Sequence, residues 1–206
     1  MYLPYSYTPE NMPFYNAKTP YTELAYWGTL LANKQKSENN VKFLHTQNLT
    51  PSFNANVIYQ RYGSEGELTK ESTDNRTFAL TGNYIGKKYV AQGGYIFNKV
   101  KRTENGGIAD PSWVLDTLVD TKIIPVVLNN TAGNILKRNT VFLTHSYSFK
   151  FRNREKDTLG IDSIKISDGT RAFIGHSFDM SIYSKKYIDN IDLGDSLARA
   201  LFNNQF

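Results

Sequence analysis

The sequence predicts an all-β fold, an antiparallel up-and-down meander of about seven strands, and three observations lead to this prediction. Apolar and polar residues alternate with a period of two in one segment after another. Aromatic residues make up 14% of the chain, with 14 Tyr and 12 Phe, and these residue types favour strands. No apolar run approaches the ~18 residues of a membrane-spanning helix, and the aromatic content argues against disorder.

Five segments alternate most clearly, and each therefore has one apolar face and one polar face. The polar positions that we single out are Asn54, Asn56, Gln60, Thr77, Thr81, Asn83, Gln92, Asn98, Thr144, Ser146, Ser148, Ser177, Asp179 and Ser181. The apolar positions are Phe53, Val57, Phe78, Leu80, Tyr84, Tyr89, Tyr95, Phe97, Val141, Leu143, Phe149, Ile174, Phe178 and Ile182.

Two further strands are predicted with less regular patterns. The segment 41–50 has Phe43 and Leu49 on one face, and Lys42, Thr46 and Asn48 on the other. The segment 19–31 has apolar residues in both phases, so its faces are not assigned. We expect residues 197–206 to begin another strand.

The connections alternate in length. Those around Pro51 and Gly86 are short, whereas residues 63–75 and 102–139 form long connections. Short turns at one end and long loops at the other are typical of transmembrane barrels. Residues 152–171 break this rule, and strand extension through 161–166 would absorb the extra length. Within the longest loop, Asp110 and Pro111 predict the start of a short helix over Trp113–Val119.

The composition argues against several functions. The net charge is +5, but Lys and Arg are scattered along the chain, so we expect no nucleic-acid partner. The absence of Cys excludes disulfides, thiolate zinc sites and cysteine nucleophiles. Asn105-Gly106-Gly107 lacks the spacing of a phosphate-binding loop, and Asp157, Asp162 and Asp168 lack that of an EF-hand. We therefore expect no catalytic residues, no metal and no cofactor, and predict that the protein is not an enzyme.

Three histidines, His45, His145 and His176, are in phase with the apolar faces of their strands. A polar ring that faces lipid far from the headgroups is unfavourable. Three explanations stay open at this point: the rings lie at a membrane interface, they bond to neighbouring strands, or the assignment of the two faces is reversed.

Two architectures fit this pattern. In a soluble β-sandwich or a lipocalin-like binding module, the apolar faces meet in a core. In a transmembrane barrel, they face lipid. Tyrosines lie at both ends of the predicted strands, as the aromatic girdles of membrane barrels require, although Tyr is also common in sandwiches.

An ordered series of short motifs resembles the putative porin family of Bacteroidota-type outer membranes, and it covers most of residues 1–182. The motifs are Tyr15-Asn16-Ala17-Lys18-Thr19-Pro20-Tyr21-Thr22-Glu23-Leu24, His45-Thr46-Gln47-Asn48-Leu49-Thr50-Pro51, Arg61-Tyr62-Gly63-Ser64-Glu65-Gly66, residues 75–80, Tyr95-Ile96-Phe97-Asn98-Lys99, Glu104-Asn105-Gly106-Gly107-Ile108 and Leu143-Thr144-His145-Ser146-Tyr147.

The resemblance implies an outer-membrane β-barrel that passes small solutes passively. Family members are several times longer, so we expect residues 1–206 to be a partial barrel domain, incomplete at both ends, with a signal peptide upstream. The polar positions given above would then line the pore, and the apolar positions would contact outer-membrane lipid. Lys42, Arg61 and Lys99 would add a mild preference for anions.

Overall fold

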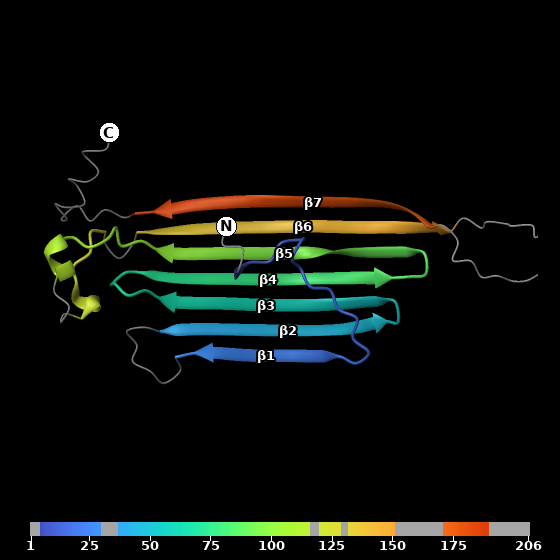
Figure 1. Cartoon of the computed structure of the whole chain (residues 1–206), viewed down its shortest axis with the longest axis horizontal. Coiled ribbons are helices and arrows are strands. Elements are labelled where there is room, and N and C mark those ends of the chain that lie inside the picture. Colours follow the sequence, from blue (N-terminus) through green and yellow to red (C-terminus); the bar gives the residue numbers. More distant parts are fainter. Residues whose placement is uncertain (1–4, 30–36, 116–119, 129–131, 151–170, 190–206) are drawn as a thin grey trace, which may run out of the picture.

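A computed structural model describes residues 5–29, 37–115, 120–128, 132–150 and 171–189, which form a single antiparallel sheet. Seven strands follow one another in chain order across the sheet (Figure 1). Their bounds are β1 Tyr21–Gly28, β2 Glu38–Thr50, β3 Phe53–Glu65, β4 Ser72–Ile85, β5 Tyr89–Thr103, β6 Gly133–Lys150 and β7 Arg171–Ile188. The predicted meander is confirmed. Among the described residues β1 pairs only with β2, and β7 only with β6, so the sheet is open.

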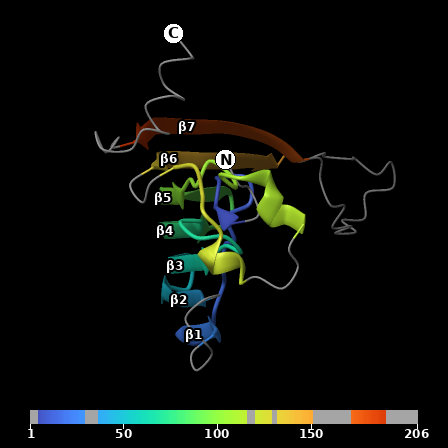
Figure 2. The same ribbon diagram turned by 90° about the vertical axis from the view of Figure 1, so that its left-hand side faces the viewer.

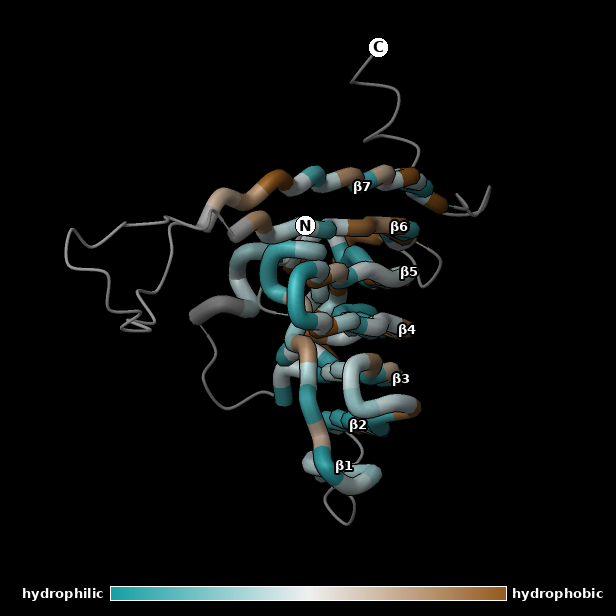
Figure 3. Tube along the Cα trace, turned by 90° about the vertical axis from the view of Figure 1, so that its right-hand side faces the viewer, coloured by the Kyte–Doolittle hydropathy of each residue, from teal (hydrophilic) through white to brown (hydrophobic). Residues whose placement is uncertain are grey.

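Successive side chains of a strand point to opposite faces of the sheet. Figure 3 shows that the hydropathy of successive residues also changes along β7. Direct pairing places residues of neighbouring strands on the same face. One such row runs Val57, Leu80, Tyr95, Val141 and Met180 across five strands. We call this face the outer face. The opposite face, with Asn56, Thr77 and Asn98, is the inner face.

The pairing also assigns the irregular strands. In β1, Leu24 pairs with Phe43 on the outer face, and Trp27 pairs with Asn40 on the inner face. Near the end of β2 the register shifts between Asn48 and Thr50. Leu49 therefore has no direct partner on β3, and the pairing does not assign it to either face.

The longest loop contains two short 3-10 helices, η3 (Pro111–Leu115) and η4 (Thr121–Ile123). The first begins where it was predicted, because the Asp110 Oδ1 accepts a hydrogen bond from the Ser112 amide at 2.9 Å. It is a tight 3-10 turn over its described length. Residues 116–119 of the expected helix lie outside the described residues, as do the segments expected at 161–166 and 197–206.

Residues 5–20 run across the inner face before β1 begins, and we call them the inner strap. The dark blue trace crosses from β5 to β1 in Figure 1, and Figure 2 shows it on one side of the sheet only. The sequence did not reveal this element, because its apolar residues follow no regular period and three prolines interrupt it.

The small core lies between the inner strap and the sheet. Leu44, Ile58, Ala79 and Ile96 pair in succession, so they form an apolar row across four strands of the inner face. These side chains pack in one buried cluster with Met12 of the strap and with Phe142.

No helix among the described residues is long and apolar enough to cross a membrane.

Candidate functional site

The predicted polar positions of the five regular strands lie on the inner face, where they fall into two groups. Seven of them on β3, β4 and β5 are buried: Asn54, Asn56, Gln60, Thr77, Thr81, Asn83 and Asn98. The others are half-buried or exposed: Gln92, Thr144, Ser146, Ser148, Ser177, Asp179 and Ser181. The inner face thus has a covered part and an accessible part, and the accessible part is mainly on β6 and β7.

The inner strap is held by side chains of the sheet that bind its backbone. The Asn98 side chain accepts a hydrogen bond from the Tyr7 amide at 3.3 Å and donates one to the Tyr7 carbonyl at 2.8 Å. At the other end of the strap, the Asn48 carboxamide accepts from the Ala17 amide at 3.2 Å and donates to Asn16 Oδ1 at 2.8 Å. Two inward-facing asparagines therefore anchor both ends of the strap.

The covered polar side chains bind one another across the strands. Thr81 donates to Asn56 Oδ1 at 2.8 Å, and Thr77 donates to Asn98 Oδ1 at 2.8 Å. Asn56 Nδ2 and Asn83 Oδ1 are buried and have no hydrogen-bond partner among the described residues. Buried polar groups need partners, so a polar or hydrated surrounding suits this face better than a dry core.

Tyr7 connects the strap to β3 by a second contact. Gln60 donates a hydrogen bond to the Tyr7 hydroxyl at 3.0 Å. Burial raises the pKa of the Tyr7 phenol above its ordinary value of 10.0, while the bond from Gln60 opposes this rise. Burial also raises the pKa of the neighbouring Tyr15 phenol. Burial at the strap therefore favours the neutral form of both phenols.

An aromatic hollow lies on the inner face near the end where the longest loop emerges. The rings of Tyr5 and Trp27 each meet the ring of Tyr62 edge to face, with centroids 5.4 and 5.9 Å apart. The hollow has a volume of about 430 Å³, and Asn40 and Asn75 also line it. Sequence reasoning missed this site because its three rings come from the strap, β1 and β3.

The predicted apolar positions all lie on the outer face, and most of them are exposed. Val57 and Phe97 are half-buried. The exposed fractions of the other twelve residues range from 36% to 60%. An exposed apolar face of this extent marks a surface that contacts another apolar phase or another protein.

The three histidines have polar or aromatic neighbours on the outer face. The His45 Nδ1 lies 2.8 Å from the Thr22 hydroxyl of the adjacent strand. His145 pairs directly with His176, and their ring centroids are 5.2 Å apart. Tyr89 is the first residue of β5, and its ring centroid lies 5.7 Å from that of His145. His45 thus bonds to a neighbouring strand, while the other two lie toward the end of the sheet that carries the short turns at Pro51 and Gly86.

The cationic residues are arranged differently from the expectation. Lys42 lies on the inner face, where its Nζ pairs with Glu23 Oε1 at 2.9 Å. Arg61 and Lys99, expected to face the pore, each lie two residues beyond an outer-face aromatic, Tyr59 and Phe97 respectively. They therefore lie on the outer face, and the prediction that they add an anion preference inside the pore is wrong.

No group of three or more acidic or histidine side chains that could hold a metal ion occurs within the described ranges. The comparisons with known proteins give one positive result: the family model described as putative porin matches residues 1–206. No curated protein and no solved structure matches the chain. The family match spans the whole chain, and this chain accordingly belongs to the putative porin family.

Proposed function

We propose that this chain forms part of the wall of an outer-membrane channel through which small solutes diffuse passively. The single observation that carries the proposal is the contrast between the two faces of one sheet. The outer face exposes apolar and aromatic side chains, whereas the inner face carries amides and hydroxyls that bind one another and the strap. Acyl chains would cover the outer face, and water would fill the accessible part of the inner face.

The dimensions of the outer face support this placement. On β5, the outer-face residues from Tyr89 to Phe97 are aromatic, Ala or Gly, and Lys99 follows. This stretch measures ~26 Å along the strand, which corresponds to roughly 20 Å of membrane thickness for a strand tilted by about 40°. The apolar band of bacterial barrels has a height of about 25 Å.

The soluble alternative, a sandwich or a lipocalin-like module, would cover these aromatic side chains with a second layer. The described residues form one sheet, and the strap packs on its inner face. We propose that further strands pair with the free edges of β1 and β7, because unpaired backbone groups are strongly unfavourable in a bilayer.

The inner strap would narrow the channel and shape its selectivity. The accessible part of the inner face is uncharged apart from a few side chains such as Asp179, Arg138 and Lys185. Such a surface suits weak selectivity among small polar solutes. We propose no enzymatic activity and no nucleic-acid partner for this face.

The test is conductance. The full-length protein that contains this chain, refolded from detergent into planar lipid bilayers, should give stepwise increases of current that persist with neutral sugars in the buffer. Folded protein should also migrate faster than heated protein in detergent gels. Ready solubility of the intact folded protein without detergent, together with no current steps, would contradict the proposal.

A pH experiment tests the role of Tyr7. Because its folded pKa is raised, the stability that neutral Tyr7 gives the strap is fully present below pH 10.0 and is lost as the pH rises through the folded pKa. We expect the conductance to increase on this alkaline side, and Tyr7→Phe to lack part of the increase. Tyr89→Phe, on the outer face, is the control. An alkaline increase that is identical in the wild type and Tyr7→Phe would exclude this role.

A further inference from the structure

Basic side chains that are far apart in the sequence form a band on the outer face, beside its apolar region. Arg61, Arg76, Lys99 and Lys137 pair in succession across β3, β4, β5 and β6. The next row adds Lys101, and Lys186 of β7. We call these six residues the outer basic band. They all lie toward the end of the sheet where the longest loop emerges (Figure 1).

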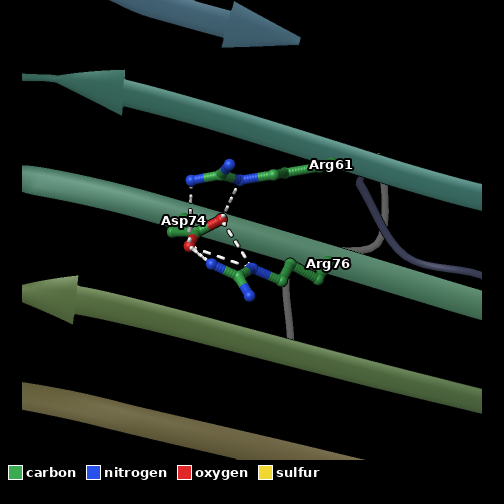
Figure 4. Close-up of polar contacts among 3 residues, drawn as sticks. All are labelled: Arg61, Asp74 and Arg76. Carbon is green, nitrogen blue, oxygen red and sulfur yellow. Dashed lines mark hydrogen bonds and ion pairs between the residues drawn. The ribbon is translucent and has the colours of Figure 1, made fainter. Parts of the chain in front are cut away.

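One carboxylate lies within the band and holds its two arginines side by side. Asp74 Oδ1 accepts from Arg61 Nε at 3.0 Å, and Asp74 Oδ2 accepts from Arg76 Nη2 at 2.6 Å. Figure 4 shows the Asp74 carboxylate between the two guanidinium groups. The arginine side chains stay 41% and 42% exposed, and their Nη1 groups bind no described residue. Asp74 thus fixes two guanidiniums and leaves their outer donors free.

The lysines of the band increase its net charge. Within the described part of the chain, no carboxylate forms an ion pair with Lys99, Lys101 or Lys137. The four residues of the first row span three strand spacings, ~15 Å. The lining of a hollow of about 250 Å³ includes Arg61, Gly63, Glu65, Asp74 and Lys101. Six cations, the bridging carboxylate of Asp74 and, at the end of β3, Glu65 therefore face the same side of the sheet.

The position of the band indicates its ligand. Tyr59, Phe78 and Phe97 precede Arg61, Arg76 and Lys99 by two residues on their strands. If the apolar region of the outer face contacts acyl chains, the basic band lies at the level of the headgroups, because cations are strongly disfavoured deeper in the hydrocarbon. Guanidinium groups bind phosphate oxygens through paired hydrogen bonds, and lysines add charge.

We propose that the outer basic band binds the phosphate groups of anionic lipids in the leaflet on the long-loop side of the membrane. This inference rests on the proposed function, since it requires the outer face to be inserted in a bilayer. Arg61 and Arg76, oriented by Asp74, provide a fixed phosphate site, and the lysines extend it along the surface of the barrel.

The test compares lipids of different charge. The full-length protein is reconstituted into nanodiscs of phosphatidylcholine alone, or of an equimolar mixture of phosphatidylcholine and phosphatidic acid. The temperature at which half of the protein loses its folded gel mobility is measured in each. Binding to the folded state raises this temperature. The wild-type protein should gain several degrees in the anionic discs, and high salt should reduce the gain.

The key variant is Lys99→Gln combined with Lys137→Gln, which leaves the Asp74 ion pairs intact. It should lose at least half of the gain. The matched control is Arg138→Gln combined with Lys185→Gln, which removes two charges from the inner face near the same end, and it should keep the gain. A second variant, Arg76→Gln, should also lose at least half of the gain.

Three results would overturn the inference: no gain in the wild type, equal losses in the variant and its control, or an equal gain from inorganic phosphate added to neutral discs. The last result would indicate a site for free anions instead of lipid. Conductance is measured on the same preparations. Normal insertion and current without discrimination between lipids would refute only the lipid site, whereas failure to insert would refute the proposed function itself.

Discussion

Replacing Leu143 with arginine is expected to destabilise the folded, membrane-inserted protein by about 2–4 kcal/mol. Leu143 lies on the outer face of β6, 48% exposed, and pairs with Gly93 and Phe178. Its neighbours along the outer face of the strand are Val141 and His145, and the aromatic residues Tyr147 and Phe149 lie beyond His145, so Leu143 lies within the apolar region. The free energy of unfolding, measured by urea titration in vesicles, gives the magnitude.

The size of this effect separates the two architectures. In a soluble protein, an arginine at a half-exposed surface leucine usually changes stability by less than about 0.5 kcal/mol. In a bilayer, the same change places a charge against acyl chains. The adjacent residue provides a matched control, because Thr144 is exposed on the inner face and bonds to Ser177 at 2.8 Å.

Thr144→Arg should cost no more than about 1 kcal/mol, the value of one hydrogen bond. Its main effect should be on ion selectivity, since it adds a cation to the accessible part of the inner face. If Leu143→Arg and Thr144→Arg are tolerated equally, the outer face does not contact lipid and the assignment of the faces fails.

The strands could be predicted because their signal is local. Alternation along each strand fixes which residues share a face, and short turns such as the one at Pro51 fix the order of neighbouring strands. The start of η3 was also a local signal, since it depends on Asp110 and Pro111 alone. Its 3-10 geometry depends on the loop around it, which no local pattern specifies.

The inner strap was not predictable because its signal is distributed over several strands. Ile58 and Ala79 each occupy a position where the alternation of their strand calls for a polar residue. A single such exception does not indicate that anything covers the inner face. Only the register places them beside Leu44 and Ile96 as one apolar row. A search for apolar residues in the polar phase of successive strands would have indicated that something covers the inner face.

The outer basic band was hidden for the same reason. The residues of its first row are 15, 23 and 38 positions apart in the sequence, so no run of charge appears. Pairing places them on adjacent strands. The sequence shows Lys and Arg scattered along the chain, and it could not show that four of them meet in space.

Replacing Met12 with aspartate is expected to detach the inner strap and increase the conductance several-fold. Met12 is 6% exposed and packs in the apolar cluster with Ile58 and Ile96. An unpaired carboxylate in this cluster would cost several kcal/mol. Each hydrogen bond that holds the strap contributes only about 1 kcal/mol. The unpaired charge therefore offsets a large part of what holds the strap against the sheet, whereas the pairing of the seven strands does not depend on Met12.

Two measurements test this together: single-channel conductance, and protease cleavage within residues 5–20 of the folded protein. Both should increase in Met12→Asp. Thr19→Asp adds the same charge at an exposed strap position and should change neither. Met12→Leu keeps the apolar contact and should behave like the wild type. If protease shows that the strap is released while the conductance stays unchanged, the strap does not restrict the channel, because a segment that narrows the pore cannot leave it without widening the path for ions.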